Sequence, residues 1–325
     1  MSFSDILAQP VAVKTFKGAL AYGRLSGAYL LSGPEGVGKR FAAREFAKAI
    51  NCEALGGDAC GRCASCRKID AGTHPDFLWI EPKTESAKIS IEAIRELKKE
   101  IALRPWEGKR RIAVIVEAEC STEEAQNAFL KMLEETPKGS LIFLTSVKQD
   151  GILPTVLSRC KVIRFGLIPT EKIRQLLQKE RGLSSEAAQA IAKLSHGSLG
   201  KALAMKEDFL ERREWISQFL EKAFHADEEK EWSESREALL EELDALTGWY
   251  RDVWMVQEGL PGRLLFHESR LSSLKEESSH WRRESVEGVL QELLRSREML
   301  EQHVNPKLLL SVLARRIRTL RESAE

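Results

Sequence analysis

A glycine-rich stretch near the N-terminus carries residue types that bind phosphate groups. The stretch GPEGVGK supplies four of them: Gly33, Gly36, Gly38 and Lys39. A working phosphate loop reads G-x-x-x-x-G-K-[ST], in which backbone amides cradle the phosphates, the lysine reaches their oxygens and the hydroxyl binds magnesium. Arg40 stands here in place of the hydroxyl residue. The stretch therefore predicts a site derived from a nucleotide site that has lost one magnesium ligand, rather than a glycine-rich turn with no ligand.

The second magnesium ligand of such a site is missing as well. In phosphate-loop enzymes an aspartate at the end of a later strand holds the ion. The apolar run RIAVIV ends at Val116 in that position, and Glu117 follows it. Two ligands of one ion lost together argue against ATP hydrolysis. The Arg40 guanidinium could still neutralise a phosphate, so binding without turnover stays open. We interpret Glu117 as a solvated carboxylate at a strand end.

Four cysteines lie close together in the sequence. Cys52, Cys60, Cys63 and Cys66 form the pattern C-x7-C-x2-C-x2-C, which predicts a tetrahedral thiolate zinc site. A ferredoxin-type cluster would continue with x3-C-P, whereas RKID follows the last cysteine. Four protein ligands leave no open position, so the zinc would be structural. The alternative is a set of unmetallated cysteines. Cys120 and Cys160 are expected to be ordinary buried thiols, and His74 is expected to be a capping or turn residue.

Apolar runs alternating with amphipathic segments predict how these residues are positioned. The expected strands are 28–32, 76–81, 111–116, 141–145 and 161–165, and the expected helices between them are 39–50, 89–103 and 121–135. Near-continuous apolar strands are typical of a parallel sheet covered on both faces. We expect the third helix to open with the capping pair Ser121 and Glu124. The fold class predicted is a doubly wound α/β domain.

The remainder of the chain reads as helical. Three domains are expected: an α/β domain at 1–166 with the cysteine module at about 51–67, a small helical lid at 167–207, and an all-α domain at 208–325 with a loop at 257–265. Five tryptophans in the last domain are expected to pack in its core rather than stack on DNA bases: Trp215, Trp232, Trp249, Trp254 and Trp281.

Composition excludes several classes of protein. Of the 325 residues, 43% are apolar, which is enough to form hydrophobic cores. The net charge is only +1. That balance argues against a broad basic face for nucleic acid. No apolar run approaches the roughly 18 residues of a membrane span, and the N-terminus lacks a basic region followed by an apolar stretch. We expect a cytoplasmic protein.

Three further segments carry a specific resemblance. Ser158-Arg159-Cys160 follows LPTVL, the predicted third helix contains NAFLKMLEETP, and AGTHPD precedes the second strand. Together with the degraded phosphate loop, they resemble the AAA+ clamp-loader family of bacterial DNA polymerase III. The resemblance is clear over about residues 1–207, and the last third matches mainly through its helical character and the ending NPKLLLSVLARRI.

The resemblance implies roles for particular residues. In that family the arginine matching Arg159 reaches into the ATP site of a neighbouring subunit, and Ser158 and Cys160 belong to the same motif. An arginine that senses the γ-phosphate is replaced here by Gly200, with Lys201 next. Thr145 and Ser146 lie where the family's sensor 1 residue would be, although a polar strand end is an equal interpretation. The family also carries a zinc-binding insertion after the loop helix.

The resemblance also implies a function. We expect a subunit that is no enzyme by itself and uses no ATP or magnesium of its own. It would be a component of the DNA polymerase III holoenzyme, in a ring with gamma/tau-type ATPase subunits and the delta subunit. The last domain would join a helical collar, and the assembly would load the sliding clamp onto primed DNA.

Two alternatives belong to other classes. A gamma/tau-type motor subunit would hydrolyse ATP itself, but Arg40, Val116 and Gly200 all disfavour it. A zinc-dependent DNA-binding module is disfavoured by the near-neutral charge.

Overall fold

The computed structural model describes residues 2–54, 56–83, 88–205, 236–302 and 304–322. The chain divides into two compact units: Met1–Leu183 with Ser195–Ala204, and Ser184–Leu194 with Met205–Glu325. This division places the helix α8 (Ser185–Leu194) with the C-terminal helices. The division into three domains stays a prediction, and its boundary at 207/208 lies outside the described residues.

A parallel sheet forms the centre of the first unit, as the apolar runs predict. The strands among the described residues are β1 (Ala28–Ser32), β2 (Phe77–Ile80), β3 (Arg111–Ile115), β4 (Ser140–Ser146) and β5 (Lys161–Arg164). Their order is β2-β3-β4-β1-β5, and every neighbouring pair is parallel. Parallel strands place all their carboxyl ends at one edge. The loop after β1 therefore lies at the same edge as the ends of β3 and β4.

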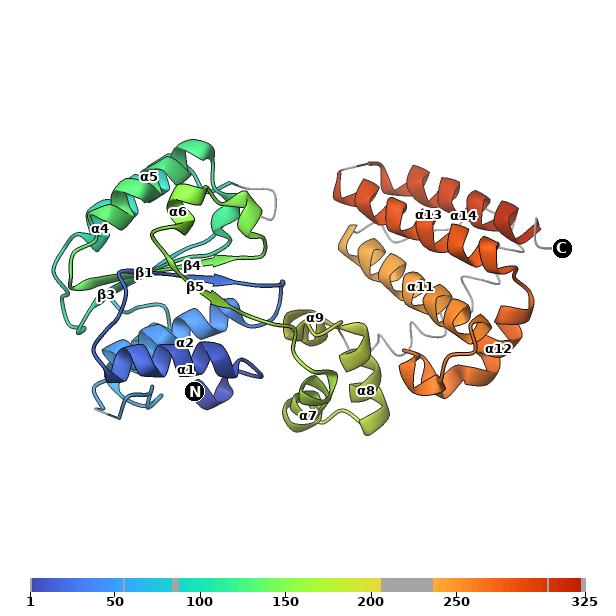
Figure 1. Cartoon of the computed structure of the whole chain (residues 1–325), viewed down its shortest axis with the longest axis horizontal. Coiled ribbons are helices and arrows are strands. Elements are labelled where there is room, and N and C mark those ends of the chain that lie inside the picture. The colour runs from blue at the N-terminus through green and yellow to red at the C-terminus, as the bar shows by residue number, and fades with distance from the viewer. Residues whose placement is uncertain (1, 55, 84–87, 206–235, 303, 323–325) are drawn as a thin grey trace. The chain divides into compact units, whose positions relative to one another are not determined.

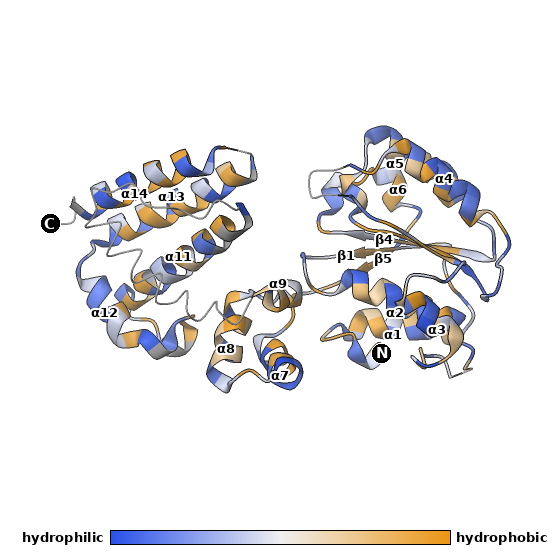
Figure 2. Ribbon diagram, turned by 180° about the vertical axis from the view of Figure 1, so that it is seen from behind, coloured by the Kyte–Doolittle hydropathy of each residue, from blue (hydrophilic) through white to orange (hydrophobic). Residues whose placement is uncertain are grey.

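Helices cover both faces of the sheet (Figure 1). The helices α1 (Pro10–Ala21) and α2 (Lys39–Asn51) pack on one face, and α4 (Ile91–Ile101) and α5 (Glu123–Glu134) pack on the other. Successive side chains of a strand point to opposite faces, so Tyr29 and Leu31 join one core and Leu30 joins the other. On the first face Phe16 and Phe46 stack with ring centroids 4.0 Å apart. Figure 2 shows mainly hydrophobic strands and helices of mixed hydropathy.

The start of α5 differs from the prediction. Thr122, not Ser121, caps the helix, and its Oγ1 accepts from the N–H of Ala125 at 3.2 Å. Ser121 is held in a parallel β-bridge with Ile89, which keeps it outside the helix. The buried face of α5 contains Ala125, Gln126, Phe129 and Met132, while Leu130 and Leu133 are only partly buried.

Further helices and 3₁₀ turns complete the first unit. They are η1 (Phe3–Asp5), α3 (Ala64–Asp70), η2 (Ala118–Cys120), η3 (Gln149–Gly151), α6 (Pro154–Leu157), α7 (Thr170–Arg181) and α9 (Leu199–Ala204). The helix α3 carries the end of the cysteine group. Arg159 follows α6, and α9 begins beside the phosphate loop.

The second unit is helical throughout its described residues, as predicted. It contains α8, α11 (Arg236–Gln257), η5 (Gly262–Leu264), η6 (Glu268–Arg270), α12 (Leu271–Ser279), α13 (Arg283–Glu301) and α14 (Pro306–Glu322). Trp249 and Trp281 are buried in its core and Trp254 packs against it, which confirms their structural role. Trp215 and Trp232 lie outside the described residues. Across the described parts of both units, no helix combines the length and apolar character that a bilayer span requires.

Candidate nucleotide site, arginine motif and cysteine group

The phosphate loop connects β1 to α2 at the carboxyl edge of the sheet. Gly33 has a φ of 156°, and a Cβ there would lie 2.2 Å from the carbonyl oxygen of Phe165. Gly36 has a φ of 71°, in the left-handed region that favours glycine. The predicted strand, loop and helix are therefore all present, and the glycines are required by local backbone geometry and close packing.

The loop lysine binds its own loop. Lys39 Nζ donates to the carbonyl oxygens of Gly33 and Pro34, each at 2.6 Å. The residue is only 7% exposed, and this burial lowers the pKa of Lys39, although Glu119, Glu35 and Glu117 oppose the shift. Its ammonium group is thus directed at the loop backbone rather than outward to a ligand.

The start of α9 packs against the same loop. The Gly200 N–H donates to the Gly36 carbonyl oxygen at 2.8 Å. A Cβ on Gly36 would lie 2.0 Å from Ser198 Oγ, and a Cβ on Gly200 would lie 2.9 Å from Gly36 Cα. This packing leaves no room for a side chain at position 200. The family resemblance expects a γ-phosphate-sensing arginine at this position. Gly200 stands there instead and packs directly on the phosphate loop at Gly36.

Neither predicted magnesium position carries a free oxygen ligand. The Arg40 guanidinium pairs with the Glu81 carboxylate just beyond β2. Val116 is fully buried in the core. Glu117 is partly buried, with its N–H donating to Thr145 Oγ1 at 3.0 Å. Thr145, the candidate sensor, is thus engaged by the backbone of the chain itself.

Glu119 is a residue of this edge that the sequence patterns did not single out. Its Oε1 accepts from the Val147 N–H at 2.6 Å, while its Oε2 is buried without a hydrogen-bond partner. The negative charge of Glu119 also opposes the lowering of the Lys39 pKa that burial causes. The only signal in the sequence is a second glutamate two residues after Glu117.

The predicted arginine lies in the turn between α6 and β5, and its side chain is 39% exposed. The Nε and Nη2 of Arg159 donate to Glu134 Oε1 at 2.9 and 2.5 Å, and Nη1 donates to the Thr155 carbonyl oxygen at 3.0 Å. Ser158 Oγ donates to the same carbonyl at 2.9 Å. Cys160 is only partly buried, contrary to expectation, and packs against the core; this burial raises its thiol pKa to about 12.

The four predicted cysteines come together at the end of α2 and the start of α3. Their Sγ atoms all lie within 4.8 Å of one another. Around a zinc ion with Zn–S distances of about 2.3 Å, tetrahedral sulfurs lie about 3.8 Å apart, so a small contraction would suffice. The N–H groups of Cys60, Cys63 and Cys66 each donate to the sulfur of the preceding cysteine, at 3.3–3.4 Å.

Such N–H···S contacts favour thiolates. The pKa of Cys60 is lowered to about 6, chiefly by a hydrogen bond from the backbone N–H of Arg62. Burial, by contrast, raises the pKa of Cys52 and Cys66. The group could hold a metal ion, and an all-sulfur donor set fits zinc. Cys120 lies outside the group and is only partly buried, so the expectation of a buried thiol is wrong for it too.

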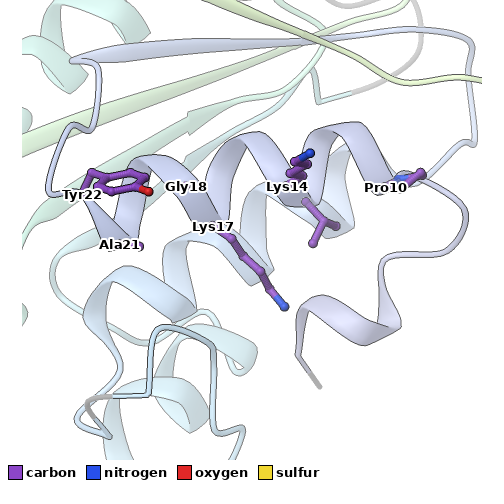
Figure 3. Close-up of a pocket in the computed structure, with 7 residues that line it drawn as sticks. Pro10, Lys14, Lys17, Gly18, Ala21 and Tyr22 are labelled. Carbon is purple, nitrogen blue, oxygen red and sulfur yellow. The ribbon is translucent and has the colours of Figure 1, made fainter.

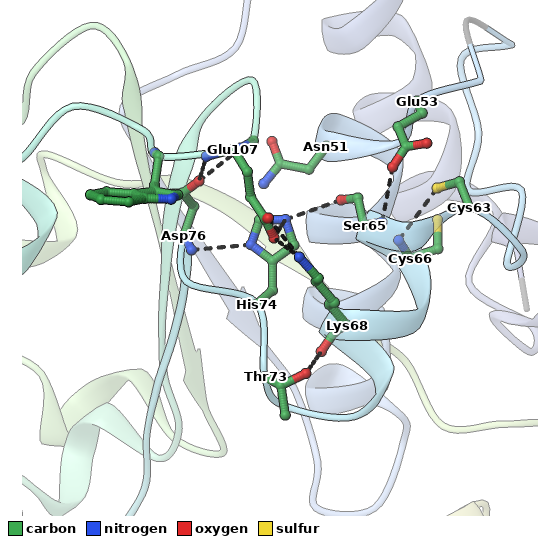
Figure 4. Close-up of polar contacts among 12 residues, drawn as sticks. Asn51, Glu53, Cys63, Ser65, Cys66, Lys68, Thr73, His74, Asp76 and Glu107 are labelled. Atoms are coloured by element: carbon green, nitrogen blue, oxygen red, sulfur yellow. Dashed lines mark hydrogen bonds and ion pairs between the residues drawn. The ribbon is translucent and has the colours of Figure 1, made fainter.

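A polar network holds the cysteine module against the sheet domain (Figure 4). His74 Nδ1 accepts from the Asp76 N–H at 3.1 Å, and His74 Nε2 lies 3.2 Å from Ser65 Oγ on α3. The carboxylate of Asp76 accepts three backbone N–H groups of residues 106–108 at 2.8–2.9 Å. Burial alone would raise the pKa of Asp76, but these donors lower it. His74 is a turn residue as predicted and also contacts the module.

A shallow pocket lies elsewhere, on α1 (Figure 3). Its lining residues are Pro10, Val13, Lys14, Lys17, Gly18, Ala21 and Tyr22. None of them belongs to the phosphate loop, the arginine motif or the cysteine group.

The fold and the loop define the class of protein. A parallel sheet of order β2-β3-β4-β1-β5 with a glycine-rich loop after β1 is an AAA+ phosphate-loop fold, here with a cysteine insertion and an all-helical C-terminal region. A family model described as "DNA polymerase III, delta subunit" matches residues 8–169. The chain belongs to this family of clamp-loader proteins.

Comparison with individual relatives shows which subunits within the family the chain is similar to. The chain is 27% identical to the DNA polymerase III subunit delta' of Bacillus subtilis, over 91% of this chain and 92% of that protein. It is 37% identical to the delta' subunit of Pseudomonas aeruginosa over 41% of each chain. It is 31% identical to the tau subunit of Escherichia coli, over 63% of this chain but only 32% of tau. The resemblance to the delta' (delta prime) subunit, to which the missing magnesium ligands point, is confirmed.

Proposed function

We propose that this chain is the non-hydrolysing stator subunit of a bacterial clamp loader and supplies Arg159 to the ATP site of a neighbouring subunit. The observation that supports the proposal most strongly is that the phosphate loop makes its polar contacts within the chain itself. Lys39 is bound to its own loop, and Gly200 is packed on Gly36. Lys39 would have to leave the two loop carbonyl oxygens that it contacts before its ammonium group could reach a phosphate.

The metal chemistry supports the same conclusion. Phosphoryl transfer depends on magnesium to bridge the phosphates and to neutralise the developing charge. Arg40 would place a positive charge where the ion's hydroxyl ligand is needed, and Val116 offers no ligand atom. Even if nucleotide entered the loop, the chain lacks the two side chains that would hold the ion beside it. We therefore propose that ATP and magnesium are not used by this subunit.

Arg159 has the exposure that action on another subunit requires. It lies at the end of α6, outside its own phosphate loop, with Ser158 supporting the turn and Cys160 anchoring it to the core. An arginine supplied in trans stabilises charge on the transferring phosphoryl group and can raise the rate by about 10³–10⁵. The chain would thus contribute to ATP hydrolysis without having an active site of its own.

The remaining assignments follow from membership of the family. We propose gamma/tau-type ATPase subunits and a delta subunit as partners in a hetero-oligomeric ring. The ring would act in the cytoplasm on a sliding clamp and primer-template DNA. The domains would be the α/β domain at 1–166, the lid at 167–207 and a collar domain at 208–325. Cys52, Cys60, Cys63 and Cys66 would hold a structural zinc ion.

ATP hydrolysis by the isolated chain tests the proposal against the motor alternative. We expect no magnesium-dependent turnover above the background of Lys39→Ala, because the loop lacks the ligands for the ion. The assay should include an ATP-competent member of the family as a positive control. Turnover that Lys39→Ala abolishes would replace the stator with a motor subunit.

A further inference from the structure

The guanidinium of Arg159 is held by a carboxylate from the segment NAFLKMLEETP, to which the sequence alone assigns no individual role. Glu134, the last residue of α5, accepts from both Nε and Nη2 through its Oε1, at 2.9 and 2.5 Å. The two residues are 25 positions apart in the chain, and α5 and α6 lie over the same face of the sheet (Figure 1). The fold, rather than local sequence, brings this pair together.

The direction of the contact determines which part of the arginine can face a ligand. A guanidinium has five N–H donors in a rigid planar fork. Glu134 engages the edge formed by Nε and Nη2, while Nη1 donates to the Thr155 carbonyl oxygen at 3.0 Å and, more weakly, to Ser158 Oγ at 3.4 Å. The carboxylate therefore does not close the edge formed by the two terminal nitrogens. That edge is the one able to bind two oxygens of a phosphate at once.

An exposed arginine without such a contact samples many rotamers. Fixing one of them costs conformational entropy, which an arginine finger must otherwise lose when it meets the phosphate. Contacts from α5 and α6 restrict the side chain beforehand. The carboxylate is itself half exposed, at 52%, so solvent screens the pair and its effect must be modest.

We propose that Glu134 is a positioning residue for Arg159: it holds the Nε edge of the guanidinium so that the terminal nitrogens are presented to the phosphate in a neighbouring subunit. This inference rests on the proposed role of Arg159 as an arginine finger. It predicts that Glu134 acts on ATP hydrolysis only through Arg159. Removal of the carboxylate should slow the chemical step and leave ATP binding by the neighbour unchanged.

The chain offers a matched control in the next residue. Glu135 carries the same charge and is 62% exposed. Its carboxylate pairs with Lys98 on α4 at 2.8 Å rather than with Arg159. Glu135→Gln therefore removes an equivalent exposed charge and ion pair one position away.

The test measures kcat and KM for ATP in complexes of the full chain with an ATP-competent clamp-loader subunit. Glu134→Gln should lower kcat about three- to fivefold, as is typical for the loss of an exposed ion pair, with KM within about twofold. Glu135→Gln should match the wild type. In the Arg159→Ala background, Glu134→Gln should have no further effect, since a residue acting through another shows full non-additivity.

The outcomes separate this inference from the proposed function. If Arg159→Ala lowers kcat but Glu134→Gln leaves it unchanged or raises it, Glu134 does not position the arginine and the finger remains. If Glu134→Gln lowers kcat equally with and without Arg159, its effect is structural and the inference is overturned. If Arg159→Ala itself has no effect, the proposed function fails and the inference fails with it.

Discussion

Replacing Arg159 with alanine is expected to lower the rate of ATP hydrolysis at the neighbouring subunit's site by about 10³-fold or more, because an arginine supplied in trans contributes on that scale. Assembly should persist, since Arg159 is 39% exposed and is held within its own subunit by Glu134 and Thr155. Single-turnover hydrolysis should be measured in complexes whose other ATP sites carry inactivating changes. Otherwise, sites served by other arginines would mask the loss.

Two variants define the chemical basis of that loss. Arg159→Lys keeps the charge but not the planar fork, so it should recover only part of the rate. Arg164→Ala, which removes an exposed arginine from the same segment at the end of β5, should hydrolyse ATP like the wild type. If Arg159→Ala and the wild type hydrolyse ATP at equal rates in complexes of equal composition, Arg159 has no role in the reaction.

Loss of the zinc ion that we propose for the cysteine group is expected to destabilise the first unit by at least about 3 kcal/mol. Structural zinc sites contribute about 10–16 kcal/mol of binding free energy in small peptides, and the network around His74 and Asp76 would retain part of the local fold here. Cys60→Ser is the informative variant, because Cys60 is less buried than Cys52 or Cys66. Its replacement therefore disturbs packing least. Thermal unfolding and metal content, measured before and after chelation, report the effect.

The control for this variant is Cys120→Ser, which alters a partly buried cysteine outside the group. It should retain one metal ion per chain and unfold close to the wild-type temperature. The zinc assignment would be wrong if the purified chain held no stoichiometric metal. It would also be wrong if Cys60→Ser unfolded together with the control.

The sheet and the two motifs were accessible from sequence because their signals are local. The five apolar runs match the strands to within one residue at each end. The signal is strongest for β1, β3 and β4, which are buried along their whole length and leave few polar positions. The cysteine spacing and the glycine loop likewise depend on residues close together in the chain. The sequence pattern places the helix cap at Ser121 rather than Thr122, because the β-bridge that removes Ser121 from the helix is a tertiary contact with Ile89.

The contacts of the phosphate loop and of Arg159 could not be predicted from the sequence, because they are long-range or depend on the direction of a side chain. Sequence identifies Lys39 but cannot show that its ammonium binds Gly33 and Pro34 instead of facing outward. The contact of Gly200 with Gly36 joins segments more than 160 residues apart. Glu134 lies in the segment NAFLKMLEETP, but Arg159 is 25 residues away in the chain, and their contact depends on the packing of α6 beside α5.

The most direct test of the account replaces the loop lysine in one subunit at a time within the assembled complex. On our proposal, this chain supports ATP hydrolysis by its neighbour and performs none itself. Lys39→Ala should therefore leave ATP hydrolysis unchanged, whereas alanine at the loop lysine of the ATPase partner should abolish it at that partner's site. A fall in hydrolysis with Lys39→Ala comparable to that of the partner's variant would contradict the account and establish this chain as a motor subunit.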